Sequence, residues 1–247
     1  MTHIDWYIGC SGFHYKEWKG VFYPKGLGTG KWFEYYARQF NTVESNVSFY
    51  RFPPLSMLQR WHERSPEYFS FSVKAPRSIT HFKKFVDCGS LLADFYSLAK
   101  EGLQEKLGCI LFQLPPSLPY SKEKLELICD ELDPGFRNVI EFRHESWWQA
   151  EVYQRLKTAG ICFCGISYPR LPDQVVCTAP VLYYRFHGVP HLYRSSYESG
   201  FLDEVVTKIQ QCPKVRTVYL YFNNTMTAAA IDNIRYIENR YELRRLP

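Results

Sequence analysis

Short runs of apolar, β-branched and aromatic residues recur along the chain, and longer segments with a helical spacing of apolar positions separate them. This alternation predicts parallel strands joined by helical crossovers. We expect eight strands, at residues 6–10, 42–48, 69–75, 108–114, 138–143, 161–167, 181–188 and 217–223. Eight parallel strands are the number that closes an α/β barrel.

The segments between the strands predict seven helices, several with a Ser, Thr or Asp near the start to cap free amide groups. They are expected at residues 31–39, 55–64, 90–100, 121–132, 147–158, 201–211 and 226–240. Residues 168–180 contain Pro169, Pro172 and Pro180, so they are predicted to form a loop. The predicted fold is therefore α/β, a TIM (β/α)₈-type barrel in which this loop replaces the helix between strands six and seven.

Length and composition agree with this fold. A single α/β barrel commonly uses 200–250 residues, and no linker or repeat divides the chain, so we expect one domain over residues 1–247. Hydrophobic residues make up 46% and charged residues 22%, which is typical of globular proteins. No apolar run is long enough to span a membrane, and the first residues do not resemble a secretion signal. We expect a cytoplasmic protein with no membrane contact.

Cysteine content and net charge add two expectations. The eight cysteines are scattered and form no C-x-x-C pair, so we expect reduced, mostly buried thiols. The net charge of +5 favours anionic ligands, because it makes the electrostatic potential around the protein more positive. It carries no information about the fold.

Polar residues lie late in nearly every predicted strand or directly after it. In a (β/α)₈ barrel the chemistry takes place at the carboxyl ends of the strands, so these positions are informative. Glu141 and Arg143 share parity on the fifth strand, as do Arg185 and His187 on the seventh, and each pair therefore faces one side. The complete set is Ser11, Glu44, Asn46, Lys74, Gln113, Glu141, Arg143, Arg185, His187, Asn223 and Asn224.

These residues allow a structural as well as a functional interpretation. Buried charges must neutralise one another or face a solvated pocket, so the set could form a polar plug at the barrel top. Asn223 and Asn224 also suit the turn between a strand and a helix. Charged residues inside otherwise apolar strands have few structural uses, which favours function for Glu44, Glu141, Arg185 and His187.

Seven segments together resemble the YecE-like family, a set of uncharacterised domains with a TIM-barrel fold. They are GCSGFHYKEWKGVFYP (9–24), FNTVESNVSFYRFP (40–53), FSVKAPRSITH (71–81), LFQLPPS (111–117), IEFRHESWW (140–148), YRFHG (184–188) and YLYFNNT (219–225). The resemblance covers almost the whole chain and implies the fold. The family has no established reaction, so function is argued from the site.

By position, the resemblance also points to residues outside the parity set. They are Tyr15 and Trp18 after the first strand, Phe49, Tyr50 and Arg51 in the second motif, and Thr80, His81, His144, Trp147 and Gly188 in the later ones. This chain departs from the family pattern at two places. Family members often have a small residue before the last helix and an Asp near the end of the sixth strand, where this chain has Met226-Thr227-Ala228 and Ser167-Tyr168.

The leading hypothesis is a metal-free pocket for an anionic ligand, such as a phosphorylated sugar, a nucleotide or an organic acid. Glu44, Glu141 and His187 would be the catalytic acid and base groups, because a carboxylate under an apolar rim can have a raised pKa. Arginine suits phosphate and carboxylate recognition. The expected ligand-binding residues are Tyr15, Trp18, Asn46, Tyr50, Lys74, Gln113, Arg143, Arg185, Asn223 and Asn224.

Other chemistries stay open. Glu44, Glu141 and His187 could hold a divalent metal in a phosphodiesterase or isomerase acting on nucleic acid or sugar, although the neighbouring basic residues would repel the cation. The two glutamates would also suit a glycoside hydrolase, depending on their separation. A non-catalytic binding protein would instead use aromatic residues such as Trp147, Trp148, Tyr193 and Tyr197. Residues 189–200 form either a mobile lid or a long connection, and the oligomeric state is open.

Overall fold

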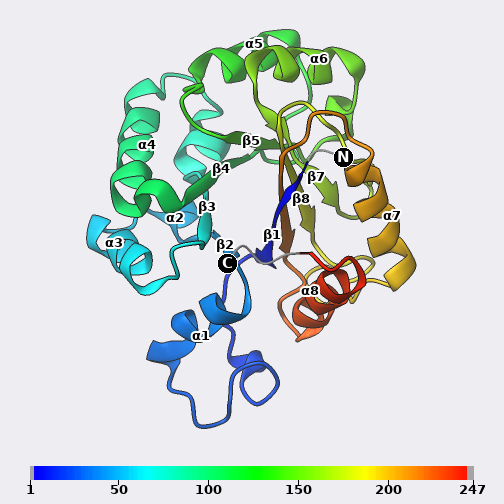
Figure 1. Ribbon diagram of the computed structural model, residues 1–247. Coiled ribbons are helices and arrows are strands. Elements are labelled where there is room, and N and C mark those ends of the chain that lie inside the picture. The colour runs from blue at the N-terminus through cyan, green and yellow to red at the C-terminus, as the bar shows by residue number, and fades with distance from the viewer. Residues whose placement is uncertain (1–2, 244–247) are drawn as a thin grey trace.

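The structure is a computed structural model that describes residues 3–243, and strands and helices alternate along the chain (Figure 1). The strands are β1 (Asp5–Cys10), β2 (Thr42–Ser45), β3 (Ser70–Lys74), β4 (Leu107–Gln113), β5 (Asn138–Glu141), β6 (Cys162–Phe163), β7 (Gly165–Ser167), β8 (Val181–Phe186) and β9 (Thr217–Phe222). Every predicted strand position is confirmed. The sixth predicted strand, 161–167, consists of β6 and β7.

All strand pairings are parallel, in the order β6-β5-β4-β3-β2-β1-β9-β8-β7. The end strands β6 and β7 are separated in the chain only by Cys164, whose backbone N–H donates to the Ile140 carbonyl of β5 (2.8 Å). The next residue, Gly165, pairs with Tyr184 of β8, and a Cβ at Gly165 would overlap the Tyr184 ring. The first half of the sixth predicted strand, β6, therefore pairs with β5, and the second half, β7, pairs with β8. This change of partner closes the predicted barrel.

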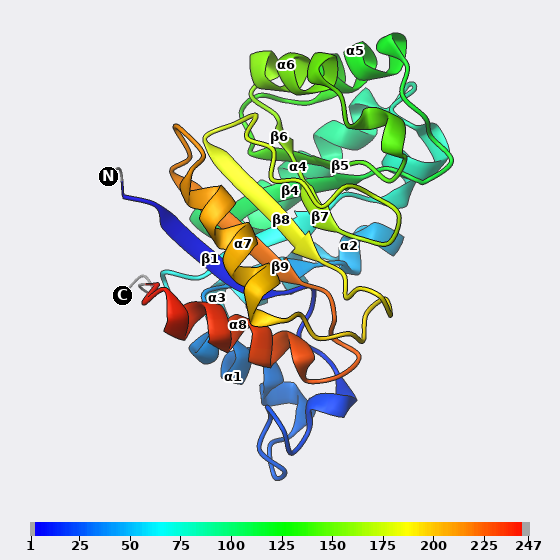
Figure 2. The ribbon, with the colours of Figure 1, turned by 90° about the vertical axis from the view of Figure 1, so that its right-hand side faces the viewer.

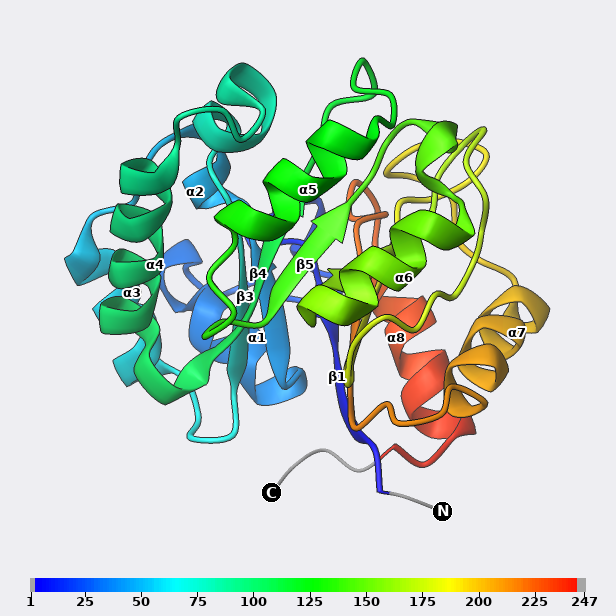
Figure 3. The same ribbon diagram turned by 90° about the horizontal axis from the view of Figure 1, so that it is seen from above.

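The helices lie outside the strands, as Figures 1 and 3 show. They are α1 (Trp32–Gln39), α2 (Val47–Tyr50), α3 (Leu55–Arg64), α4 (Gly89–Leu103), α5 (Lys122–Glu131), α6 (Ala150–Ala159), α7 (Ser199–Gln210) and α8 (Ala229–Arg240). All seven predicted helices are present. The short helix α2 was not predicted, and it begins within the range expected for strand two because Asn46 (φ −101°, ψ 1°) turns the chain after Ser45.

The segment between β1 and α1 projects away from the strands, and α7 and α8 pack beside β8, β9 and β1 (Figure 2). Residues 168–180, between β7 and β8, contain no helix, which confirms the predicted loop. This loop passes close enough to the residues after α7 to be joined to them covalently.

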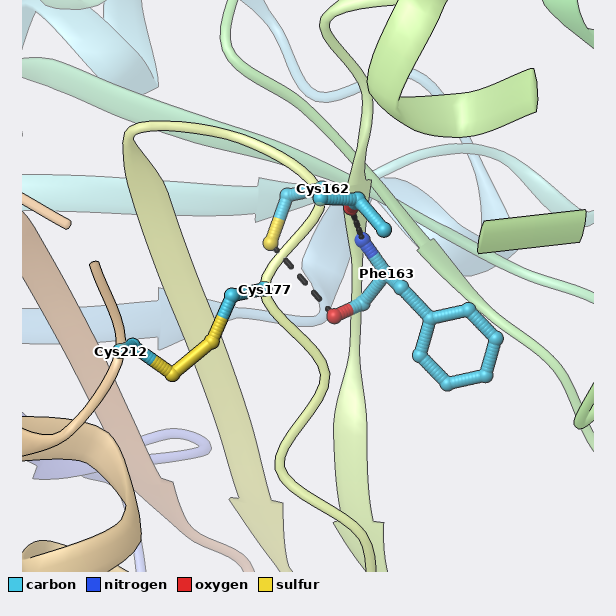
Figure 4. The surroundings of a disulfide bond; sticks show 5 residues. Cys162, Phe163, Cys177 and Cys212 are labelled. Carbon is cyan, nitrogen blue, oxygen red and sulfur yellow. Dashed lines mark hydrogen bonds between the residues drawn. A yellow bond between two sulfur atoms is a disulfide. The ribbon is translucent and has the colours of Figure 1, made fainter. Parts of the chain in front are cut away.

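Cys177 in that loop forms a disulfide with Cys212, the second residue after α7 (Figure 4). The expectation of reduced cysteines is therefore wrong for this pair. The two residues are 35 positions apart in sequence while their Cα atoms lie 6.3 Å apart, a proximity that spacing along the chain could not reveal. The other six cysteines are free and buried, as expected.

Strand alternation divides the core into two parts. Outward-facing residues pack against the helices, and inward-facing residues fill the barrel. The interior is rich in tyrosine: Tyr219 stacks on Tyr7 with ring centroids 4.7 Å apart, and Tyr183 lies 5.0 Å from Tyr221. The Tyr221 hydroxyl contacts Thr42 (2.5 Å) and Ser72 (2.9 Å), so the polar atoms of this core are paired. These rings form the floor beneath the site.

Within residues 3–243, no helix is both long and apolar enough to cross a bilayer. The cytoplasmic location stays a prediction.

Candidate active site at the mouth of the barrel

The polar residues singled out by parity converge at the carboxyl ends of the strands. Glu44, Glu141 and Arg185 are fully or almost fully buried on the inner face, level with the strand ends. Neighbouring strands hold them in register: Gln113 of β4 pairs with Glu141, and Arg185 of β8 pairs with Tyr221 of β9. Each same-parity pair, Glu141 with Arg143 and Arg185 with His187, lies on one face as predicted, and the two pairs contact one another across the barrel.

Arg185 links the two glutamates. Its Nη1 donates to Glu141 Oε2 (2.5 Å) and its Nη2 to Glu44 Oε1 (2.6 Å), while the Tyr183 hydroxyl donates to Glu44 Oε2 (2.6 Å). The remaining oxygen, Glu141 Oε1, accepts from Arg143 Nε. All four carboxylate oxygens are thus hydrogen-bonded, and two carboxylates balance two guanidiniums, which is the pairing that buried charges require.

His187 lies between Arg143 and Asn223. Its Nε2 is 3.2 Å from Arg143 Nη2, and its Nδ1 is 3.1 Å from Asn223 Nδ2. Because a guanidinium can only donate, Nε2 must carry a lone pair and the N–H is on Nδ1, so the Asn223 amide has to be turned over to present its oxygen to that N–H. Burial, followed by the charges of Arg143 and Arg185, lowers the pKa of His187 well below its usual value. The imidazole is therefore neutral at pH 7.

The pKa of Glu141 shifts in the direction opposite to the one expected. Burial alone would raise the pKa, but the adjacent guanidiniums of Arg143 and Arg185 outweigh it and hold the pKa well below the usual value. The expectation of a raised pKa is wrong for this residue, since the sequence does not show that two arginines approach the same carboxylate. Glu141 is ionised throughout the physiological range.

Lys74, at the end of β3, has a different environment from the arginines. Its Nζ donates to Gln113 Oε1 (2.6 Å) and lies 3.9 Å from the centroid of the Phe49 ring. Within residues 3–243 no carboxylate lies within ion-pair distance of it. Burial, then the nearby Arg185 charge, lowers the pKa of Lys74 to about 7 against the smaller opposing effect of Glu141 and Glu44.

A cavity of about 190 Å³ opens above this cluster. Its lining contains three basic side chains, three side-chain amides and three aromatic rings, namely Lys74, Arg143, Arg185, Asn46, Gln113, Asn223, Phe49, Tyr50 and Tyr193. Glu44 and Glu141 are not among the lining residues, because they lie beneath the arginines. A ligand in the cavity therefore meets cations and amide groups first.

A larger groove of about 670 Å³ adjoins the cavity, and the two share Asn46 and Tyr50. Apolar and aromatic residues such as Phe13, Met57 and Trp61 line most of it. The groove exceeds the cavity in volume but holds few charged groups. The cavity above Arg185 is accordingly where the charged side chains of the site meet solvent.

The model of the family described as "Protein of unknown function DUF72" matches residues 7–246. The chain belongs to the DUF72 family. Among curated relatives, the UPF0759 protein YunF of Bacillus subtilis is 25% identical over 92% of this chain and 91% of YunF. The UPF0759 protein YecE of Escherichia coli strain K12 is 29% identical over 70% of this chain and 61% of YecE. The YecE-like resemblance is confirmed.

Among solved structures, a DUF72 family protein from Thermotoga maritima is similar to this chain with a TM-score of 0.86. It is 26% identical, and the match covers 96% of this chain and 99% of that one. The family is one of unknown function, so the chemistry of this DUF72 chain has to be argued from its own side chains.

The remaining predicted ligand residues lie apart from the cavity. Trp18 is completely buried, and its Nε1 donates to the carbonyls of Thr225 and Thr227, so it packs the β1–α1 segment and is not exposed to a ligand. Asn224 is also buried and donates to the Ser195 carbonyl and to Asn233, so its amide joins the 189–200 segment to α8. Tyr15 lines only the larger groove.

Three aromatic residues near the site were not among the predicted site residues. Tyr183 binds Glu44, and its parity with Arg185 could have indicated this. Tyr193 lines the cavity, and backbone hydrogen bonds join it to His187 and Met226. These bonds favour a fixed connection over a mobile lid for this part of residues 189–200. Tyr168 stacks on Arg143, 4.1 Å from ring centroid to Cζ, and only the path of the 168–180 loop brings it there.

Proposed function

We propose that this protein binds an anionic small molecule, a phosphorylated sugar, a nucleotide or an organic acid, in the cavity above Arg185 and carries out proton-transfer chemistry on it. The observation that supports this most is the lining of the cavity: basic and amide side chains face the space, while both carboxylates lie beneath and are neutralised by guanidiniums. An anion entering the cavity meets no repelling charge.

Arg143 is suited to hold the anion. Its Nε and Nη2 are fixed by Glu141 and His187, and within residues 3–243 no hydrogen bond uses Nη1. A guanidinium whose plane is already fixed loses little conformational freedom when it binds an oxyanion. The Tyr168 ring on one face of Arg143 restricts it further.

The catalytic roles assigned to Glu44, Glu141 and His187 stay predictions, and the geometry supports an indirect part for them. Their polar atoms hold Arg185 and Arg143 in place. The group that can exchange a proton near neutral pH is Lys74, since its pKa is lowered to about 7. Sugar phosphates and oxo acids have C–H bonds next to a carbonyl group, and such a bond is acidic enough for a positioned base to remove its proton.

The alternatives have less support. A divalent metal on Glu44, Glu141 and His187 does not fit this donor set, because all four carboxylate oxygens and His187 Nε2 already face donor hydrogens. The two glutamates bind one arginine beneath the cavity, which does not suit glycosidic cleavage between them. Trp147 is completely buried, so it gives no surface for a partner protein.

Titration of the full chain with inorganic phosphate, followed by one sugar phosphate, one nucleotide and one dicarboxylic acid, tests the proposal by calorimetry. Arg143→Gln should weaken anion binding about tenfold or more, because a charge-assisted hydrogen bond contributes roughly 1.5–3 kcal/mol. Arg155→Gln is the matched control, since Arg155 forms its ion pairs with Glu126 and Asp130 on α5.

Tyr50→Glu provides a second variant that removes no ion pair. Tyr50 is 69% exposed and lines the cavity, so the variant protein should fold normally. The new carboxylate at position 50 should repel the anion. If no member of the panel binds, or if both variants bind phosphate as tightly as the unmodified chain, the cavity is not an anion site.

A further inference from the structure

Among residues 3–243 a second lysine, Lys106 just before β4, is also buried, and it differs from Lys74 in how its amine is satisfied. Lys106 Nζ has three acceptors, the His62 carbonyl at 2.6 Å, the Ser65 carbonyl at 2.9 Å and Ser65 Oγ at 3.0 Å. Three acceptors match the three hydrogens of an ammonium ion. Lys74 Nζ has one, Gln113 Oε1, and its other contact is the face of the Phe49 ring, which attracts a cation only weakly. One acceptor for three hydrogens leaves an ammonium poorly satisfied at this position, and that favours a neutral amine with a free lone pair.

The position of Lys74 gives the amine access to a ligand. The residue is 8% exposed and lines the 190 Å³ cavity together with Arg143 and Arg185. A desolvated lysine close to other cations is a recognised arrangement for a nucleophilic amine, because both effects favour its uncharged form. The lowered pKa of Lys74 agrees with this geometry.

We propose that Lys74 is a nucleophile that forms an imine with the carbonyl carbon of a small anionic carbonyl compound, whose carboxylate or phosphate is held by Arg143. The inference rests on the proposed anion site and names its substrate class, an oxo acid or the phosphate ester of a hydroxy ketone. The cavity is smaller than a typical drug-sized pocket, which fits a ligand of this size.

The step balances within the two reactants. The Nζ lone pair forms the C–N bond while the carbonyl π electrons move to oxygen, and that oxygen then leaves as water with the two amine protons. The product is a C=N bond between Lys74 and the former carbonyl carbon. No oxidant, reductant or metal is consumed, and the imine can take up a proton from solvent.

Reductive trapping tests the proposal directly. The full chain is incubated at pH 7 with pyruvate or with dihydroxyacetone phosphate in the presence of cyanoborohydride, and the adduct is located by peptide mass spectrometry. Lys74 should be labelled before every other lysine, since its neutral fraction at pH 7 exceeds that of an ordinary lysine about a thousandfold. Preference for one probe tells a carboxylate ligand from a phosphate ligand.

Two variants and a neutral probe make the outcome specific. Lys74→Arg keeps a long basic side chain without a nucleophilic amine and should lose the adduct. Gln113→Glu keeps the contact to Nζ but adds a carboxylate, so the amine becomes protonated and trapping at pH 7 should slow by about tenfold or more. Acetone, which has the carbonyl of pyruvate without its carboxylate, should label Lys74 far more slowly than pyruvate does.

Failure of this inference can be told apart from failure of the proposed function. If phosphate binds in the calorimeter but label appears only on exposed lysines, Lys74 is not the nucleophile and the anion site stands. If acetone labels Lys74 as fast as pyruvate does, the amine is nucleophilic but the anionic substrate class is overturned.

Discussion

At the scale of single residues, the site depends on which buried polar atoms have partners. Tyr183 and Tyr184 are adjacent on β8 and point to opposite sides of the sheet. The inward hydroxyl of Tyr183 donates to Glu44 Oε2 (2.6 Å), whereas the buried hydroxyl of Tyr184 has no hydrogen-bond partner within residues 3–243. The two residues are therefore a natural matched pair for measuring the hydrogen bond beneath the site.

Tyr183→Phe should lower the free energy of unfolding by roughly 1.5–3 kcal/mol, because it leaves a buried carboxylate oxygen of Glu44 without its donor. Tyr184→Phe should change it by less than about 0.5 kcal/mol or stabilise the protein, since it removes an unsatisfied buried hydroxyl. Urea unfolding at pH 7 measures both. Equal losses in the two variants would show that the Tyr183–Glu44 bond makes no special contribution.

At the scale of elements, close strand packing at β1 and β2 positions the first residues of the mouth. Gly9 is in register with Thr42, and a Cβ at Gly9 would overlap the Thr42 carbonyl oxygen and lie 2.9 Å from the Tyr36 hydroxyl. That hydroxyl also accepts from Cys10 N (2.7 Å) and donates to the Thr42 carbonyl (3.0 Å). A side chain at position 9 would therefore disturb the helix contact and the strand pairing together.

Gly9→Ala should destabilise the protein by about 1–3 kcal/mol or more, as expected for overpacking against backbone that cannot move away. Gly28→Ala is the control, because no atom lies within 4 Å of a Cβ built there. Thermal unfolding of the two variants makes the comparison. A Gly9→Ala variant as stable as Gly28→Ala would mean that β1 and β2 are less closely packed than described.

At the scale of the whole molecule, the barrel encloses two ion-paired arginines and one lysine without a carboxylate partner, so stability depends on pH. The pKa of Lys74 is lowered to about 7 in the folded chain from its ordinary value of 10.5. Between these values the unfolded chain binds more protons than the folded chain, so the contribution of Lys74 to stability rises with pH. The penalty for burying it is complete below pH 7 and disappears as pH approaches 10.5.

The free energy of unfolding of the unmodified chain minus that of Lys74→Met should therefore increase by about 1.4 kcal/mol per pH unit between pH 8 and 10. Urea unfolding across this range gives the slope. Lys208→Met, which removes an exposed lysine of α7 that pairs with Glu204, serves as the control. A difference that stays flat with pH would show that Lys74 titrates normally.

Periodicity along the chain determined most of the fold. Runs of apolar, β-branched and aromatic residues located every strand position, and the three prolines of 168–180 located the missing helix, because these signals act on the local backbone. Parity along the fifth and seventh predicted strands likewise placed Glu141 with Arg143, and Arg185 with His187, before any contact was known.

Which of these groups meet depends on how the chain folds. The pairing of Arg185 with both glutamates, the neutral His187 and the lowered pKa of Lys74 arise from side chains on strands far apart in sequence, and electrostatic effects depend on distance and burial. The Cys177–Cys212 disulfide is of the same kind. Residue type and spacing indicate which chemical groups a chain contains. Folding sets the distances between these groups, and the distances determine whether a charged residue acts as a counter-ion, as a ligand-binding group or as a nucleophile.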